Sequence, residues 1–209
     1  MVSSVSQEIG DRLLKLETGK LAQQANGSVV IQYGDNVLLI TSTMSDPREG
    51  IDFFPLTVDF EERMYARGKI PGSFFRREGR PSTLGILTAR MTDRPIRPLF
   101  PTGFKNEVQI IGTALSVDQE APLDILSIIG ASTALSISDI PFEGPISATQ
   151  MGYVNDNLVV NPTYEQLENS DLDLIVAGSM SGVIMMEAGA NELSESVILA
   201  AIEKAQQVN

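Results

Sequence analysis

The apolar residues of this chain fall into short β-branched runs separated by turn signals, and this pattern limits the fold more than any other feature. Residues 28–33 and 37–44 are two such runs, and the Gly34-Asp35-Asn36 segment between them is typical of a β-hairpin. Alternating or continuous apolar runs indicate further strands. These are expected over 12–18, 53–61, 106–117, 146–154, 158–160, 172–177 and 183–187.

Three helical runs, at 83–93, 123–138 and 192–207, are interleaved with the strands. Because helices and strands alternate without a regular βαβ repeat, the sequence predicts an α+β fold with helices packed on one side of a mixed sheet. The length of 209 residues allows a sizeable core, so we expect a single domain over 1–209. Neither a signal peptide nor an apolar membrane span is recognisable, which favours a cytoplasmic protein.

The first helical run has signals for its start and its end and has an apolar face. Ser82 or Thr83 can cap the helix, and Pro95 is expected to break or kink it. Leu84, Leu87 and Met91 recur at helical spacing, so we expect them to share one face of the helix.

The chain contains no cysteine and no histidine, and their absence excludes several kinds of catalytic site. It cannot form a thiolate or imidazole zinc site, a Ser-His-Asp triad or a cysteine nucleophile. Any chemistry must therefore use carboxylates, hydroxyls, lysine, arginine or a metal ion held by oxygen ligands.

The charges are segregated along the chain, although their sum is −12. Residues 63–105 contain ten of the fifteen basic residues and two acidic ones, whereas residues 106–203 contain fifteen acidic residues and no basic one. Eight of the ten are arginines, whose planar guanidinium suits phosphate oxygens. This segregation favours an anionic ligand. The alternative is that the basic face pairs with the acidic remainder, within the domain or across an oligomer.

Residues 64–80 are rich in glycine and proline and predict a long loop, which in a compact domain is usually functional or disordered. Within it, Phe74 and Phe75 directly precede Arg76 and Arg77. Aromatic rings stack on unpaired bases while guanidinium groups contact phosphates, so this arrangement is typical of single-stranded nucleic-acid binding. The alternative is that the two phenylalanines anchor the loop to the core.

Arginines continue into the helix that follows this loop. Arg90 and Arg94 lie four residues apart and share a helix face. Arg97 joins them only if Pro95 kinks the helix rather than ending it. Asp93 could instead engage one of these arginines in a local ion pair.

Several strings in the chain resemble the first RNase PH-like half of the polynucleotide phosphorylase family. The most specific are FFRREGRPS and DRPIRPLFP, and LETGKLAQQANGSVV, DFFPLTVDFEER, IGASTALSISDIPFEGPI and LDLIVAG extend the resemblance over nearly the whole chain. The resemblance implies an RNase PH-like fold, of the ribosomal protein S5 domain 2-like type. It also implies phosphorolytic 3′ to 5′ degradation of RNA, releasing nucleoside diphosphates, by a ring-shaped homotrimer. In the family each subunit has two RNase PH-like halves, a helical linker, and KH and S1 domains.

The resemblance implies that this half is not catalytic. The phosphate-binding turn of the family's active half falls on residues 122–124, where hydroxyls are missing and a carboxylate is present. The family's metal and acid–base site falls on Leu167, Asp173 and Ile175, so only one acidic residue remains. Asp171 and Asp173 share a strand face and could hold a hard cation weakly, but a solvated strand start is the favoured interpretation. We expect no catalytic residue, no metal and no cofactor in this domain, with Mg²⁺ and inorganic phosphate serving the full enzyme.

The resemblance also implies which residues bind RNA, by motif match. They are Phe74, Phe75, Arg76, Arg77, Arg80, Arg94 and Arg97. A processive phosphorolytic enzyme must grip the backbone without reading bases, and arginines with stacking rings achieve this.

Expected partners are single-stranded RNA, the second RNase PH-like half and two further copies of the full protein, with no membrane. Two other functions fit the same residues. One is a stand-alone non-catalytic ring subunit of an exosome-like complex, and the other is a regulatory domain that binds a nucleotide or another anion.

Overall fold

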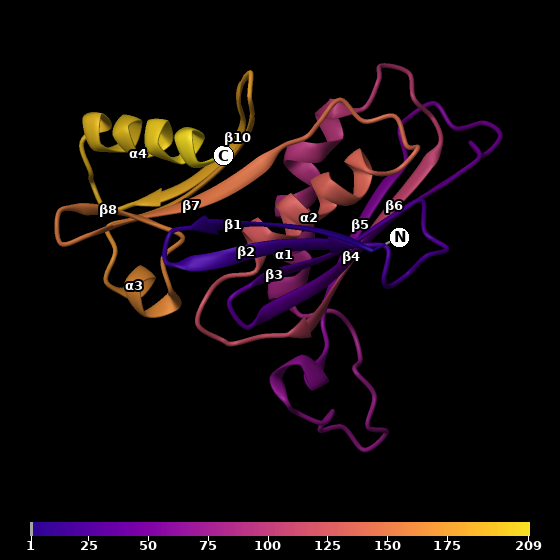
Figure 1. Ribbon diagram of the computed structural model, residues 1–209, viewed down its shortest axis with the longest axis horizontal. Helices are drawn as coiled ribbons and strands as arrows, with labels where there is room; N and C mark the ends of the chain where they lie inside the picture. Colours follow the sequence, from indigo (N-terminus) through magenta and orange to yellow (C-terminus); the bar gives the residue numbers. More distant parts are fainter. Residues whose placement is uncertain (1) are drawn as a thin grey trace.

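The computed structural model describes residues 2–209, and its strands form two sheets flanked by helices (Figure 1). In chain order the elements are β1 (Ser3–Ile9), β2 (Arg12–Thr18), β3 (Gly27–Tyr33), β4 (Asn36–Ser45), β5 (Leu56–Glu62), η1 (Met64–Arg67), α1 (Thr83–Ile96), η2 (Arg97–Leu99), β6 (Glu107–Ser116), α2 (Asp124–Ser136), β7 (Ser147–Val154), β8 (Asn157–Val160), α3 (Tyr164–Glu168), β9 (Leu172–Ser179), β10 (Gly182–Ala190) and α4 (Glu195–Val208). The larger sheet has the order β1-β2-β3-β4-β6-β5, and the smaller has the order β10-β9-β7-β8. Only β5 and β6 pair in parallel, so the larger sheet is mixed and the predicted α+β class is confirmed.

Helix α2 joins the two sheets because it is apolar on all sides. It packs on β3 and β4 of the larger sheet and on β7 of the smaller one, and ten of its thirteen residues are buried. At Gly27 the packing is so close that a Cβ would lie 1.9 Å from the carbonyl oxygen of Ala134. The sequence predicts one mixed sheet, and the structure differs in having a second, antiparallel sheet. A helix with no polar face can cover two sheets at once.

Helix α1 is longer than predicted. It continues to Ile96 with Pro95 inside it, so the proline does not end the helix. Of the three residues on the predicted apolar face, Leu84 and Leu87 are 45% and 56% exposed, whereas Met91 is partly buried and packs against the core.

Over its first three turns, α1 buries a face of small residues, which are Gly85, Thr88, Ala89 and Thr92. A Cβ on Gly85 would lie 2.9 Å from the carbonyl oxygen of Phe60 on β5. The Thr92 hydroxyl donates to the carbonyl oxygen of Thr88 at 2.9 Å and lies 2.8 Å from the hydroxyl of Ser127 on α2. Small side chains allow the helix backbone to approach its neighbours closely, so α1 buries them and turns its leucines outward.

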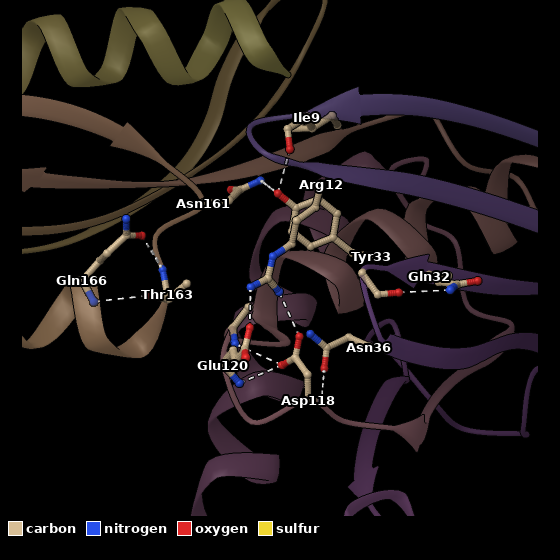
Figure 2. Close-up of polar contacts among 12 residues, drawn as sticks. Ile9, Arg12, Gln32, Tyr33, Asn36, Asp118, Glu120, Asn161, Thr163 and Gln166 are labelled. Carbon is tan, nitrogen blue, oxygen red and sulfur yellow. Dashed lines mark hydrogen bonds and ion pairs between the residues drawn. The ribbon is translucent and has the colours of Figure 1, made fainter.

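Two elements have weak sequence signals and are absent from the sequence-based prediction. β1 is polar and exposed along almost its whole length, and antiparallel pairing with β2 holds it in place. α3 is a five-residue helix that begins with a capping box formed by Thr163 and Gln166 (Figure 2). The T-x-x-Q spacing of that box is visible in the sequence.

A polar network connects the β1–β2 turn to the loop before α2. Figure 2 shows the Arg12 guanidinium between Asp118 and Glu120, with both N···O distances at 2.9 Å. The Tyr33 hydroxyl donates to the carbonyl oxygen of Ile9 at 2.7 Å and accepts from the amide of Asn161 at 3.5 Å, which brings in the smaller sheet. Although burial alone would raise the pKa of Asp118, backbone hydrogen bonds and the charge of Arg12 lower it more. The pKa of Asp118 therefore lies below its usual value.

We expect Arg12→Ala to lower the free energy of unfolding by about 1–3 kcal/mol at pH 7, because it leaves partly buried Asp118 without its cation. Since the folded-state pKa of Asp118 is lowered, the contribution of its ionised form is present above the usual carboxyl pKa and is lost as the pH falls below it. The difference in the free energy of unfolding between the unchanged chain and Arg12→Ala should therefore shrink in acid. Urea denaturation at several pH values measures this difference.

The matched control is Arg48→Ala, which removes an exposed ion pair with Glu107. Exposed pairs contribute about 0–1 kcal/mol, so this variant should change stability little. Equal effects of the two substitutions would contradict the role assigned to Arg12.

Candidate nucleic-acid interface

The segment between η1 and α1 has no regular secondary structure and projects from the body of the protein at the bottom of Figure 1. Near its tip, Phe74 is 95% exposed and Phe75 is 75% exposed. Their rings contact each other edge to face, with centroids 5.4 Å apart. The alternative that these rings anchor the loop to the core is therefore wrong. Their faces lie open to solvent and suit stacking on unpaired bases.

The arginines of the loop are exposed beside these rings. Arg76, Arg77 and Arg80 make no ion pair with any residue in the 2–209 range. Glu78, which lies between them in sequence, turns back and accepts a hydrogen bond from the backbone amide of Met64 at 3.2 Å. The single acidic residue of the loop thus supports its base rather than neutralising its arginines.

The basic residues of the chain divide into those that form ion pairs and those that do not. Of the fifteen basic residues, eight form ion pairs within the part of the chain that the structure describes, and seven do not. Six of these seven lie within residues 69–105, and the seventh is Lys204. The six are Lys69, Arg76, Arg77, Arg80, Arg90 and Lys105. Pairing with the acidic remainder inside the domain therefore does not account for these six. It does account for Arg63, Arg67 and Arg94, whereas Arg97 pairs with Asp93 inside the basic segment.

Arg97 is engaged within the fold. Its guanidinium donates to both carboxylate oxygens of Asp93, at 2.6 and 2.9 Å, and to the carbonyl oxygens of Phe54 and Leu56, at 3.3 and 3.1 Å. It also lies 5.8 Å from the centre of the Phe54 ring. The local ion pair with Asp93 that the sequence allowed is thus confirmed. An RNA phosphate could reach this guanidinium fully only by displacing Asp93.

Arg94 lies in a groove between α1 and β10. It forms an ion pair with Glu187 of β10, and both side chains are about half exposed. The groove has a volume of about 690 Å³, and Leu87, Arg90 and Asp173 also line it. Of the seven residues predicted to bind RNA, five are therefore exposed and free of acidic partners in the described chain, and two are ion-paired.

The positions that correspond to the family's metal site do not fit a metal ion. Leu167 lies on α3 and Ile175 is buried in β9, so neither offers a ligand atom. Asp173 accepts a hydrogen bond from the Gln150 amide at 2.7 Å, and Asp171 accepts one from Asn191 at 3.3 Å. Within residues 2–209, no group of three or more acidic side chains is arranged to hold a metal ion.

The positions that correspond to the phosphate-binding turn do not fit phosphate either. Asp124 stands in the first turn of α2 and accepts a hydrogen bond from the Thr88 hydroxyl. Burial raises the pKa of Asp124, and the charges of Asp173 and Glu187 raise it further, while the Thr88 hydrogen bond lowers it. A phosphate here would meet a carboxylate where the family's active half has hydroxyls.

Two solved structures share this arrangement of sheets and helices. Rice (Oryza sativa) Rrp46 superposes with a TM-score of 0.71 at 14% identity, covering 100% of this chain and 88% of that chain. The Archaeoglobus fulgidus exosome, solved with RNA bound to its active site, gives a TM-score of 0.71 at 17% identity, covering 99% of this chain and 84% of that chain. At these identities the likeness shows the fold alone, and the fold is RNase PH-like.

Sequence comparison gives the family. Residues 10–141 match the model of the 3′ exoribonuclease family, domain 1, and residues 144–208 match the model of domain 2. This chain belongs to the 3′ exoribonuclease family.

The chain is similar to bacterial polyribonucleotide nucleotidyltransferases. It is 58% identical to that of Natranaerobius thermophilus over 208 residues, which is 99% of this chain and 29% of the relative. It is 60% identical to that of Heliobacterium modesticaldum over 198 residues, which is 94% of this chain and 28% of the relative. The chain therefore spans less than a third of the length of these relatives. No helix within residues 2–209 is long and apolar enough to cross a membrane.

We expect Asp124→Asn to be more stable than the unchanged chain at pH 7. Because the folded-state pKa of Asp124 is raised, folding favours its protonated form, and stability is lost as the pH rises through that pKa. The amide keeps an acceptor for Thr88 and carries no charge, so it avoids this loss. Urea midpoints measured between pH 3 and pH 7 should show an advantage for the variant that disappears in acid.

Asp46→Asn provides the control, because Asp46 is exposed and no shift in its pKa is resolved. A lower midpoint for Asp124→Asn than for the unchanged chain at pH 7 would mean that the Asp124 charge stabilises α2 rather than opposing folding.

Proposed function

We propose that this chain is the RNA-binding, non-catalytic first core region of a polyribonucleotide nucleotidyltransferase, an enzyme that degrades single-stranded RNA from the 3′ end with phosphate and releases nucleoside diphosphates. One observation carries this proposal. Six exposed basic side chains form no ion pair within residues 2–209 and lie in residues 69–105, and three of them, Arg76, Arg77 and Arg80, share a loop with two exposed phenylalanine rings. Similarity to relatives of that name supports the reaction class.

The chemistry of these side chains suits RNA held without regard to sequence. Arginine and lysine contact the phosphates that every nucleotide carries, and a phenylalanine ring stacks on any base. An enzyme that degrades RNA stepwise needs this kind of grip, because each cycle presents a different base at the same place.

We infer that catalysis takes place on another part of the enzyme. The positions of the phosphate-binding turn, residues 122–124, offer a carboxylate and no hydroxyl. The positions of the metal site offer one carboxylate, that of Asp173, because Leu167 and Ile175 are apolar. Mg²⁺ and inorganic phosphate are then bound by a second RNase PH-like half, and the two halves assemble as a homotrimer in the cytoplasm. The segments matched as domains 1 and 2 act together as one RNase PH-like unit over 1–209, since α2 packs against both sheets.

We expect the double substitution Arg76→Ala and Arg77→Ala to weaken binding of single-stranded RNA. Each lost phosphate contact should lower the slope of log affinity against log salt by about 0.7, since fewer counterions are released on binding. Fluorescence anisotropy with labelled oligo(A) at several salt concentrations measures both quantities.

Arg48→Ala is the control, since Arg48 is exposed and lies outside residues 63–105. Unchanged affinity and slope in the double variant would remove the loop from the RNA path. Displacement of the RNA by low concentrations of ADP would favour the alternative of a regulatory nucleotide-binding domain.

The 209-residue chain alone should release no nucleoside diphosphate from poly(A) in the presence of phosphate and Mg²⁺. The physical reason is that the positions of the family's metal ligands carry Leu167 and Ile175. Chromatography of the products detects the nucleoside diphosphate, with a full-length relative as the positive control. Turnover by the purified chain at stoichiometric concentration would show that the active site lies within these residues.

A further inference from the structure

Helix α1 separates two grooves, and Arg90 and Arg94 line both of them. One groove, of about 370 Å³, lies between α1 and β5, with Asp59 on its far wall. The other is the larger groove between α1 and β10 described above. These two arginines therefore stand on a ridge that a ligand can reach from either side.

Arg90 is the arginine of this ridge that forms no ion pair within residues 2–209. Its side chain is exposed and forms no ion pair within residues 2–209, whereas Arg94 and Arg97 are paired with Glu187 and Asp93. It is also not among the residues that the family motifs single out for RNA.

Arg90 lies close to the loop that carries the other unpaired arginines. The loop ends at Ser82, whose side chain caps α1 by accepting from the backbone amide of Gly85 at 3.0 Å. Arg90 is about 12 Å farther along the helix axis, because it lies eight residues after Ser82 and a helix rises about 1.5 Å per residue. Ile86 and Leu87, on the way, are 52% and 56% exposed. A flexible strand leaving the loop therefore meets an exposed helix surface before it meets Arg90.

Glu187 presents a carboxylate to Arg94 in the way that a phosphate would. It lies on β10, across the groove from α1, and both members of the pair are about half exposed. Exposed ion pairs are weak, so a polyanion that enters the groove can compete with Glu187 for the guanidinium.

We propose that the RNA path continues from the loop onto α1, where Arg90 contacts a backbone phosphate. In the absence of RNA, the Glu187 carboxylate occupies the place on Arg94 that a second phosphate would take. The proposal rests on the RNA-binding function proposed above and deepens it. It assigns a binding role to Arg90 and a competing role to Glu187.

The test measures binding of labelled oligo(A) by fluorescence anisotropy across a salt series, using the 209-residue chain. Arg90→Ala should lower the slope of log affinity against log salt by about 0.7, which is about a 2.6-fold smaller loss of affinity between 50 and 200 mM salt. Arg90→Lys keeps the charge and should keep the slope. Arg48→Ala should leave affinity and slope unchanged, since that residue is exposed and paired with Glu107 outside residues 63–105.

Glu187→Gln should raise the affinity and steepen the slope, because Arg94 becomes available to phosphate. The same substitution in an Arg94→Ala background should have no effect, and this double-mutant cycle separates unmasking of Arg94 from a general loss of negative charge. An equal gain in both backgrounds would overturn the masking role of Glu187. Circular dichroism and urea midpoints confirm that each variant is folded.

Failure of this inference is distinguishable from failure of the proposed function. If the chain binds RNA, and Arg76→Ala with Arg77→Ala weakens that binding, an unchanged slope in Arg90→Ala would show that the RNA leaves the chain at the loop. If neither set of variants changes binding, or if the unchanged chain does not bind RNA, the proposed function itself is wrong.

Discussion

Close packing of α1 against β5 and α2 determines where the arginines of the interface lie. Gly85 approaches the β5 backbone, and Thr92 meets Ser127 of α2 through their hydroxyl groups. Because this small-residue face is buried, the opposite face must point to solvent, and that face carries Leu87, Arg90 and the loop junction at Ser82. A helix that buried its leucines would have directed these arginines elsewhere.

Electrostatics then divides the basic residues into two groups with different tasks. Some are engaged inside the protein: Arg12 joins the β1–β2 turn to the loop before α2, and Arg97 joins the end of α1 to residues 54–56. Others, among them Arg76, Arg77, Arg80 and Arg90, form no ion pair within residues 2–209 and are exposed on the loop and on α1. Exposed arginines without an acidic partner can attract an anion even in a protein whose net charge is −12.

The groove between α1 and β10 brings together residues that are far apart in the sequence. Asp124, Asp173 and Ile175 line it and offer carboxylate and methyl groups. Burial raises the pKa of Asp124, and the nearby charges of Asp173 and Glu187 raise it further. Carboxylates with no cation between them repel phosphate, so this wall of the groove does not suit an anion.

The sequence by itself determined most of the strands, the hairpin at Gly34, the long loop with its Phe–Arg cluster and the family, because these depend on local spacing and on motifs. Only the tertiary structure decided which face of α1 is buried, since helical periodicity identifies Leu84 and Leu87 as a stripe but cannot weigh that stripe against close approach at Gly85. It also decided which arginines are available. The sequence does not show that Arg90 and Arg97 differ in their hydrogen-bond partners. Arg97 is bound by Asp93, one helix turn away, and by two carbonyl groups about forty residues away in the chain. These groups meet only when the chain folds.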